Sequence, residues 1–327
     1  MISFRIFVKT KIRTTMKRTT LFLLLLAFAG CLTAYSQKKE APERQGWGKE
    51  SLYGNVERVT ITQYKLADKF GEIIKEKVKE KVVYTFNAKG NVLEKCEYNS
   101  DDTLKEKELY KYDSLGNKIE KIRYDGIGLL DCKWIYKYDT RGNVIESTPY
   151  SCNGSLNCKY IYKYNSGNKP IEYYWYNRDG SLICYHLYKY DPQGNRTEQA
   201  VYNSDGLITS KWLYKYDSQG NRIEWLLYDN NNESLLNGKI LYKYDSQGNM
   251  IELARYNSDG SLQFKWIYKY DSQGNKIEEA KYKSNGSLSW KETYKYDSQG
   301  NLIEEVEYKS DIMIPVEMEE REIVYRQ

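Results

Sequence analysis

The chain has 327 residues, with 50 Lys and Arg against 45 Asp and Glu, one His and 34 Tyr. A single His leaves the chain almost without the commonest general base and metal ligand, and many Tyr favour strands over helices. The formal charge of +5 is typical of proteins that bind nucleic acid or an anionic surface, so its distribution along the chain matters.

Residues 1–36 have the pattern of an export signal. The apolar run 21–30 follows two basic residues and is too short for a transmembrane helix, which needs about 20 apolar residues. It suits the hydrophobic region of a secretory signal, followed by small residues at a cleavage site. Translation could start at Met1 or at Met16, because the second methionine begins a compact signal by itself.

Two cleavage sites are compatible with this signal. Ala34-Tyr35-Ser36 before Gln37 offers the small residues that ordinary signal peptidase prefers. The run 28–31 instead resembles a bacterial lipobox, so that the signal would end at Gly30 and Cys31 would become a lipidated N-terminus. If the first site is used, Cys31 is only a small apolar residue of a discarded signal.

The positive charge belongs to this signal. Residues 1–36 contain six basic residues and no acidic one, so the rest of the chain carries 44 basic and 45 acidic residues and a net charge of −1. We therefore expect no nucleic-acid partner. Residues 37–47 are polar and charged and are interpreted as a linker.

After the linker the chain repeats itself. The motif Tyr-Lys-Tyr-Asp, followed by Gly-Asn, recurs with a period of 26 residues, lengthened once to 28. Such a period indicates a repeat architecture. A weaker copy starts at Tyr84. The main copies, some imperfect, start at Tyr110, Tyr136, Tyr162, Tyr188, Tyr214, Tyr242, Tyr268 and Tyr294.

Each repeat contains two turns and two strands. The runs 271–275 (Asp-Ser-Gln-Gly-Asn) and 257–261 (Asn-Ser-Asp-Gly-Ser) place Gly fourth after an Asx residue, which is typical of a type I turn closed by a left-handed Gly. Segments of about eight residues between the turns are rich in Tyr, Trp, Ile and Lys and are predicted strands. Each repeat is therefore a β-hairpin, and the chain a long antiparallel meander.

Strand alternation assigns side chains to faces. One face carries the Trp and Tyr rows, and the other carries an aliphatic stripe bordered by Lys and Glu. Counting through the turns after the Tyr-Lys-Tyr strands places Ile277 opposite Lys269. Counting through the other turns predicts direct aliphatic pairs, which stabilise a sheet. The expected pairs are Ile119 with Ile135, Ile145 with Ile161, Ile171 with Leu187, and Ile251 with Ile267.

The predicted fold class is all-β: a curled antiparallel meander of about nine 26-residue hairpins over residues 84–308. A flat layer would leave apolar side chains wet on both faces, and long sheets curl, so one face should become an interior. Residues 48–83 are expected to form a divergent leading β unit, and 309–327 a C-terminal strand or tail. The charged run 317–321 is expected to protect the final sheet edge.

The repeat resembles the YD repeat of RHS-type bacterial surface and secreted proteins. The residues concerned are Tyr-Lys-Tyr-Asp-Ser-Gln-Gly-Asn, then Ile-Glu and Asn-Ser-Asp-Gly-Ser-Leu, and the resemblance covers 84–308. It implies hairpins in a spiralling sheet that can close into a shell. Larger members carry a C-terminal toxin and a self-cleaving core. Only 19 residues follow Tyr308, so no toxin is expected here. A weaker similarity links the turn at 257–262 to the aromatic hairpin repeats of cell-wall-binding modules.

The aromatic row is the candidate binding surface. Exposed, these rings could stack on sugar rings; buried, they would be core. No catalytic or metal-ligating residue and no cofactor is predicted. The candidate binding residues are Trp134, Tyr160, Trp212 and Trp266, with Tyr136, Tyr214 and Tyr268.

Other chemically active residues have structural interpretations. His186 occupies the register of Trp134 and is expected to replace an aromatic ring. The turn carboxylates are expected to serve turn geometry rather than calcium, because the EF-hand pattern is absent. A set of glutamates recurs at one register beside Lys, which favours cross-strand ion pairs over a hydrolytic carboxylate pair: Glu120, Glu146, Glu172, Glu224, Glu252 and Glu278.

The cysteines give a test of topology. Cys132, Cys158 and Cys184 are one repeat apart, so with two strands per repeat they should lie about 9.5 Å apart, too far for disulfides. Cys152 and Cys158 flank a turn and form the best candidate pair.

These observations favour a non-enzymatic exported binding scaffold, lipid-anchored at the cell envelope or secreted. Its expected ligand is carbohydrate or a cell-surface protein, and its only expected membrane contact is a lipid on Cys31. The alternative is a protein-interaction or assembly module in which the aromatic row is core and the Lys and Glu face binds. A glycan-acting hydrolase is the remote alternative.

Overall fold

The computed structural model describes residues 52–228, 236–309 and 313–326, all within one compact unit, Pro42–Gln327. The expected export signal, with Cys31, and the expected linker lie outside the described residues. No helix in the described ranges is long and apolar enough to span a membrane.

Within these ranges, twenty strands form one sheet. The strands are β1 (Val56–Lys69), β2 (Glu72–Phe86), β3 (Val92–Tyr98), β4 (Leu104–Tyr112), β5 (Lys118–Asp125), β6 (Leu130–Tyr138), β7 (Val144–Ser151), β8 (Cys158–Tyr164), β9 (Pro170–Asn177), β10 (Leu182–Tyr190), β11 (Arg196–Asn203), β12 (Ile208–Tyr216), β13 (Arg222–Tyr228), β14 (Leu236–Tyr244), β15 (Met250–Asn257), β16 (Leu262–Tyr270), β17 (Lys276–Lys283), β18 (Leu288–Tyr296), β19 (Leu302–Lys309) and β20 (Ile314–Tyr325).

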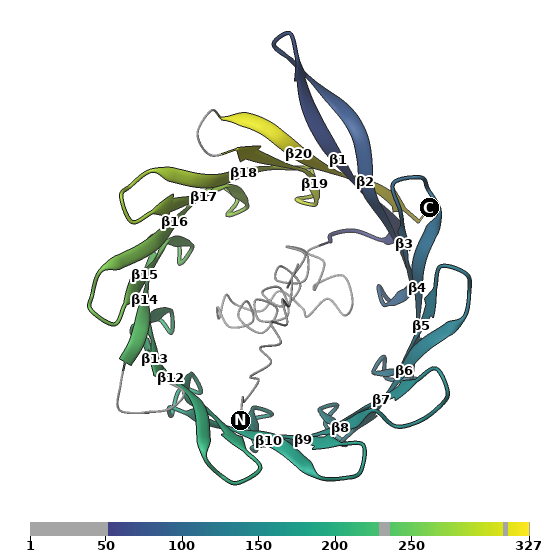
Figure 1. Cartoon of the computed structure of the whole chain (residues 1–327), viewed down its shortest axis with the longest axis vertical. Coiled ribbons are helices and arrows are strands. Elements are labelled where there is room, and N and C mark those ends of the chain that lie inside the picture. The colour runs from purple at the N-terminus through teal and green to yellow at the C-terminus, as the bar shows by residue number, and fades with distance from the viewer. Residues whose placement is uncertain (1–51, 229–235, 310–312, 327) are drawn as a thin grey trace, which may run out of the picture. The chain divides into compact units, whose positions relative to one another are not determined.

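The sheet closes on itself. Each strand pairs antiparallel with its neighbours in the chain, and β1 also pairs with β20 from Val56 opposite Tyr325 to Lys65 opposite Glu317. Figure 1 shows the resulting ring of strands. The prediction of an all-β curled meander of hairpins is confirmed. The expectation that residues 317–321 protect a free edge is wrong, because β20 pairs with β1 on one side and with β19 on the other.

The turn after each Tyr-Lys-Tyr strand is held by its Asx residue. In the turn after β16, the Asp271 carboxylate accepts hydrogen bonds from the backbone N–H groups of Gln273 (2.9 Å) and Asn275 (2.8 Å) and from the Asn275 amide (2.9 Å). Gly274 has φ +84°, a backbone conformation that is strained for residues with a side chain. The motif Asp-x-x-Gly-Asn is therefore explained by turn chemistry, as the sequence predicts.

The second Tyr of the motif links successive hairpins. Its hydroxyl donates a hydrogen bond of 2.7–2.9 Å to a backbone carbonyl at the start of the preceding return strand. This contact explains why Tyr, and not Phe, precedes the turn. The bonds run from Tyr112 to Val92, Tyr138 to Lys118, Tyr164 to Val144, Tyr190 to Pro170, Tyr216 to Arg196, Tyr244 to Arg222, Tyr270 to Met250, and Tyr296 to Lys276.

We expect Tyr270→Phe to lower the free energy of unfolding by about 1 kcal/mol, because the half-buried carbonyl of Met250 loses its donor. Urea unfolding followed by circular dichroism measures the change. Tyr282→Phe is the matched control, since no described group hydrogen-bonds to that hydroxyl. Equal losses in both variants would show that the hydroxyl bond contributes nothing specific.

The predicted strand register is off by one residue. Lys269 lies opposite Glu278 and Tyr270 opposite Lys276, so Ile277 is the extra residue of a β-bulge and is 38% exposed. The same bulge follows the other turns of this kind. The expected aliphatic pairs are therefore wrong, and a glutamate takes the place of the first isoleucine. The observed pairs are Glu120 with Ile135, Glu146 with Ile161, Glu172 with Leu187, and Glu252 with Ile267.

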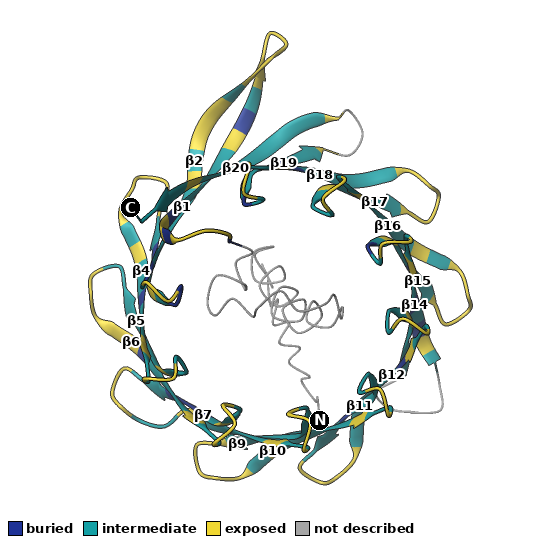
Figure 2. Ribbon diagram, turned by 180° about the vertical axis from the view of Figure 1, so that it is seen from behind, coloured by how far each residue is buried: buried dark blue, intermediate teal, exposed yellow. Residues whose placement is uncertain are grey.

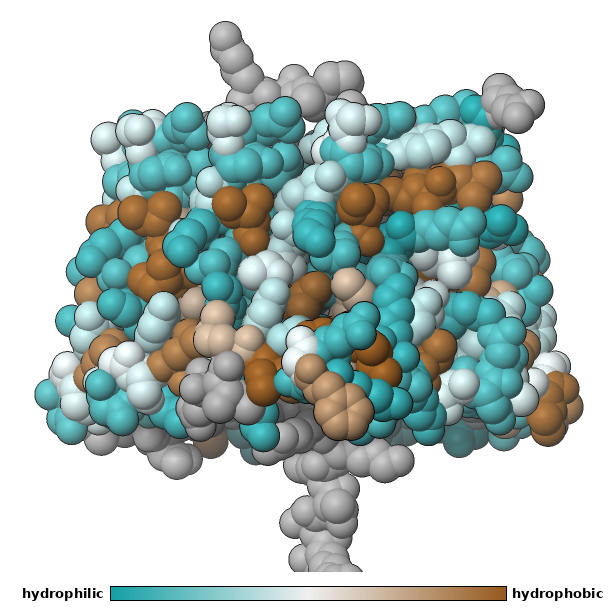
Figure 3. All heavy atoms as spheres, turned by 90° about the horizontal axis from the view of Figure 1, so that it is seen from above, coloured by the Kyte–Doolittle hydropathy of each residue, from teal (hydrophilic) through white to brown (hydrophobic). Residues whose placement is uncertain are grey.

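The bulge places the recurrent glutamates beside lysines on the outer face of the ring. Their ammonium–carboxylate distances are 2.5–3.0 Å, and the lysine side chains are 56–69% exposed. Cross-strand pairing of these glutamates is confirmed. Figure 3 shows hydrophobic side chains in separate patches among hydrophilic ones on this surface. The pairs are Lys111–Glu120, Lys137–Glu146, Lys163–Glu172, Lys189–Glu198, Lys215–Glu224, Lys243–Glu252, Lys269–Glu278 and Lys295–Glu304.

Fully buried apolar side chains gather where the ring closes. Leu52, Val56, Val59 and Phe86 form a cluster, with Tyr325 packed against it. Elsewhere most strand residues are half-buried, as Figure 2 shows and as a single-layer sheet requires. The packed core therefore stabilises the junction between the two ends of the meander, and the rest of the ring depends on hydrogen bonds and cross-strand pairs.

Candidate functional site

The candidate binding residues share the inner face of the ring. Strand alternation and the observed pairing place Trp134 and Tyr136 of β6 on the face opposite the paired lysines. Side chains on the concave face of a closed sheet crowd together, and Tyr214 is accordingly only 7% exposed. By the same alternation, Tyr160, Trp212, Trp266 and Tyr268 join them on β8, β12 and β16.

The inner rings are neither a closed core nor freely exposed. Six of the seven candidate residues are half-buried, and Tyr214 is buried. Burial raises the pKa of Tyr136 and of Tyr214 to about 12, so both phenols remain neutral donors at physiological pH. In the described ranges the sheet is a single layer, so no second layer of strands covers these rings.

Further aromatic residues of the inner face were missed by the sequence reasoning. Tyr160 lies 5.9 Å, centroid to centroid, from both Tyr173 and Trp175 of β9. Trp266 lies 5.2 Å from Trp290 of β18, at a steep angle. With the bulge included in the count, strand alternation would have placed Tyr173 and Trp175 on the aromatic face, and alternation along β18 alone places Trp290 there.

Cations lie over the inner rings. In β5, Lys121 lies 4.9 Å and Arg123 5.5 Å from the Trp134 ring. Both cations also have carboxylate partners, Glu108 at 2.5 Å and Asp131 at 2.5 Å. These cation–ring contacts hold the Trp134 ring in place and leave little free charge in this sector.

His186 lies within the aromatic row, as predicted. Its ring meets that of Tyr173 edge-on at 4.8 Å, and its Nδ1 is 3.5 Å from the Tyr188 hydroxyl. Burial lowers the pKa of His186 below its ordinary value, so the imidazole is neutral at pH 7. Its neighbours are aromatic, which agrees with a packing role.

Two indole N–H groups of the inner face are buried without a hydrogen-bond partner among the described residues. They belong to Trp175 of β9 and Trp225 of β13. Buried donors are nearly always satisfied, by protein, water or ligand. These two atoms are therefore positions where an acceptor on a bound molecule would be stabilised.

An acidic sector interrupts the aromatic face near the closure. Glu292 of β18 occupies the register that Trp266 holds in the preceding repeat, and it lies between Glu279 of β17 and Glu307 of β19. Glu305 of β19 lies opposite Glu319 of β20. Like charges directly opposite are destabilising, so this sector disfavours bound anions.

The described cysteines are free thiols. Cys132, Cys158 and Cys184 lie on β6, β8 and β10, two strands apart, which confirms two strands per repeat. Cys152, the candidate partner of Cys158, is exposed and not bonded to it. In the described ranges, no cluster of three His, Cys, Asp or Glu side chains could hold a metal ion.

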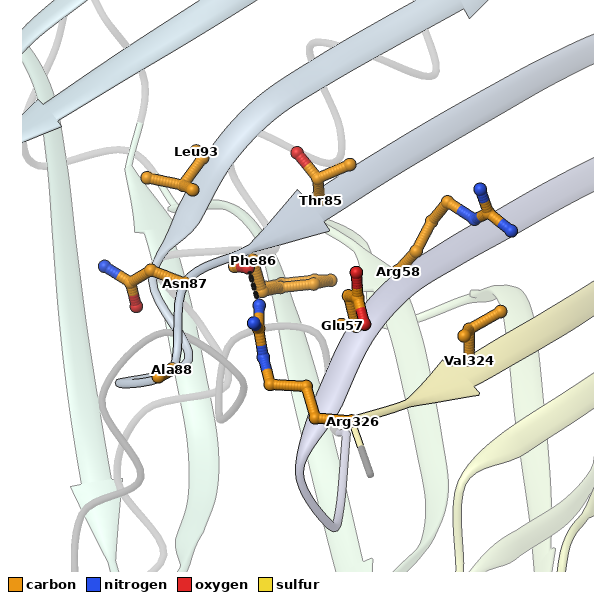
Figure 4. A pocket seen from close by; sticks show the side chains of 9 residues that line it. All are labelled: Glu57, Arg58, Thr85, Phe86, Asn87, Ala88, Leu93, Val324 and Arg326. Atoms are coloured by element: carbon orange, nitrogen blue, oxygen red, sulfur yellow. Dashed lines mark hydrogen bonds between the residues drawn. The ribbon is translucent and has the colours of Figure 1, made fainter.

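A cavity of about 590 Å³ lies beside the closure of the ring. Figure 4 shows Leu93, Thr85 and Val324 around it, with the Arg326 guanidinium directed at the Phe86 carbonyl, to which it donates a hydrogen bond. This bond ties the end of β20 to β2. The cavity is thus bordered by groups already engaged in closing the ring.

No protein-family model matches this chain, and no curated protein matches its sequence. Solved structures with some likeness include the crystal structure of TcdB2-TccC3-TEV, at 11% identity and a TM-score of 0.39 over 80% of this chain and 16% of that chain. A porin-like protein from Bacteroides uniformis has 10% identity and a TM-score of 0.37 over 82% of this chain and 98% of that chain. Scores below 0.5 do not support a functional comparison.

Proposed function

We propose that this chain is a non-enzymatic, exported binding scaffold of the cell envelope whose inner aromatic face binds carbohydrate. The observation that carries the proposal is the inner row of half-buried rings, which recurs in most hairpins of a single-layer closed sheet. With about twenty strands, a closed sheet is too wide for one layer of side chains to fill. Aromatic rings on its inner face therefore offer flat apolar surfaces on which sugar rings can stack.

The contacts on the outer face also favour the inner face as the binding surface. Its lysines and glutamates form cross-strand ion pairs, whereas the inner face presents two indole donors that no described residue accepts from. The absence of a catalytic role is an expectation from the sequence, supported by the aromatic surroundings of His186 and by the ion pairs of the recurrent glutamates. Export and lipid attachment at Cys31 rest on residues 1–36.

We expect Trp212→Ala to weaken glycan binding at least tenfold, because a central aromatic anchor is worth about 2 kcal/mol or more. A glycan array identifies the ligand, and titration calorimetry measures the loss. Tyr256→Ala is the control, since alternation places this ring on the outer face beside Lys239.

Thermal unfolding must show that both variants fold. Unchanged glycan affinity in folded Trp212→Ala would contradict the proposal. Failure to bind any glycan, together with capture of one defined surface protein that is lost on charge reversal of the outer lysines, would favour the interaction module.

A further inference from the structure

We propose that the inner face contains an anion site between Arg196 and Arg222, and that the glycan recognised by this protein therefore carries acidic groups. The inference rests on the proposed function and specifies its ligand class. Both guanidinium groups lie near one ring, with their carbons 5.7 Å and 4.7 Å from the Tyr214 centroid.

The two arginines occupy one register in adjacent hairpins. Each is the first residue of its return strand, β11 or β13, directly after the turn asparagine. Their backbone carbonyls accept the hydroxyl bonds of Tyr216 and Tyr244, which fixes the backbone beneath each side chain. Corresponding positions in most other hairpins hold Lys, Val, Pro, Met or Leu, so the arginine pair distinguishes this sector of the ring.

Arg196 and Arg222 have no carboxylate partner among the described residues. Lys121 and Arg123 each form an ion pair, whereas Arg196 donates only to the neutral Gln199 amide at 3.1 Å. The Arg222 Nε atom is buried without a partner. A buried donor of a cationic group that lacks a hydrogen-bond partner is costly unless an acceptor, best an anion, binds to it.

The surroundings of the pair offer donors rather than acceptors. The unpartnered indole N–H of Trp225 belongs to a ring 6.0 Å from Tyr214. From the observed pairing, the inner positions of β10 to β14 hold no acidic residue within the described ranges. Guanidinium groups bind carboxylate and sulfate through paired N–H donors, and the adjoining rings suit a sugar face.

An acidic glycan fits better than nucleic acid. The chain beyond residue 36 has a net charge of −1, and Glu292 and Glu305 lie on the same inner face further along the ring. A polymer with one phosphate per residue would meet this acidic sector, whereas a glycan with spaced carboxylates or sulfates can avoid it.

The test starts from an array of neutral, uronate-bearing and sulfated glycans. The acidic glycans should give the signals, and carboxyl reduction of a bound uronate glycan should weaken its binding about tenfold. Arg196→Met and Arg222→Met should each weaken binding of the intact glycan about tenfold and reduce its salt dependence, with little effect on the reduced glycan. Lys215→Met, on the outer face of the same hairpin, should leave binding unchanged.

Four other results would contradict the anion site, the proposed function or the ligand class. Equal binding of intact and reduced glycans, lost in Trp212→Ala, would overturn the anion site and leave the proposed function standing. No glycan binding at all would overturn both. Competition by inorganic sulfate alone at millimolar concentration, without glycan selectivity, would show a simple ion site. Tighter binding of a single-stranded oligonucleotide than of any glycan would overturn the ligand class.

Discussion

Replacing Asn301 with alanine is expected to lower the free energy of unfolding by about 3 kcal/mol, since its side chain makes several hydrogen bonds and each lost bond is worth roughly 1 kcal/mol. The Asn301 side chain is fully buried. Its amide donates to the Tyr53 carbonyl at 3.1 Å and to the Tyr325 hydroxyl at 2.8 Å, and its carbonyl accepts from the Tyr53 N–H. One side chain thus joins the beginning of the described chain to its end.

Asn275→Ala is the matched control. Asn275 holds the same position in the preceding repeat, but its amide donates only locally, to Asp271 at 2.9 Å and Gln273 at 3.4 Å. We expect this variant to lose about 1 kcal/mol. Urea unfolding measures both changes, and hydrogen exchange of β1 and β20 should accelerate only in Asn301→Ala. Equal losses in the two variants would show that Asn301 serves its turn and not the closure.

Glu292→Gln is expected to stabilise the protein at pH 8 and to have little effect at pH 5. Burial and then the Glu305 carboxylate raise the pKa of Glu292 to about 9, with Glu279 and Glu307 adding to the shift. The unfolded chain releases this proton near pH 4.5, so the stability linked to the proton is present below pH 4.5 and is lost as pH rises toward 9. Glutamine keeps the acceptor for the Tyr294 hydroxyl, which lies 2.7 Å away.

The midpoint of thermal unfolding should rise by about 2 °C or more at pH 8, for a gain of roughly 1 kcal/mol in a domain of this size. Glu278→Gln is the control with the opposite sign. Burial raises the pKa of Glu278, but Lys269 and Lys291 outweigh it and hold the pKa below its ordinary value. That variant should lose stability at pH 8. A flat pH profile in the wild-type protein between pH 5 and 9 would contradict the prediction for Glu292.

The repeat motif determined the turns and the assignment of faces. Asp271, Gly274 and Asn275 interact within five residues, so a short sequence is sufficient to specify their geometry. The same locality explains why the aromatic row, from Trp134 to Tyr268, could be placed on one face. Alternation along a strand depends only on the chain itself.

The strand register could not be counted from the turns, because a bulge at Ile277 adds a residue that no local signal distinguishes from the strand around it. The resulting one-residue error assigned Ile277 rather than Glu278 to the position opposite Lys269. It also assigned return-strand aromatic residues, such as Trp175, to the outer face instead of the inner face. Register is settled by partners on another strand, and hence by tertiary structure.

The sequence by itself determined a meander of hairpins with one aromatic and one charged face, since period, turn chemistry and alternation are local properties. Only the tertiary structure decided that β1 pairs with β20, because that contact joins residues more than 250 positions apart. Closure makes the aromatic face an inner surface. The register of neighbouring strands places Arg196 and Arg222 beside one ring without an acidic partner among the described residues, and it gathers Glu279, Glu292 and Glu305 into one sector. Such electrostatic neighbourhoods depend on which strands become adjacent and on the curvature that turns their side chains toward one another.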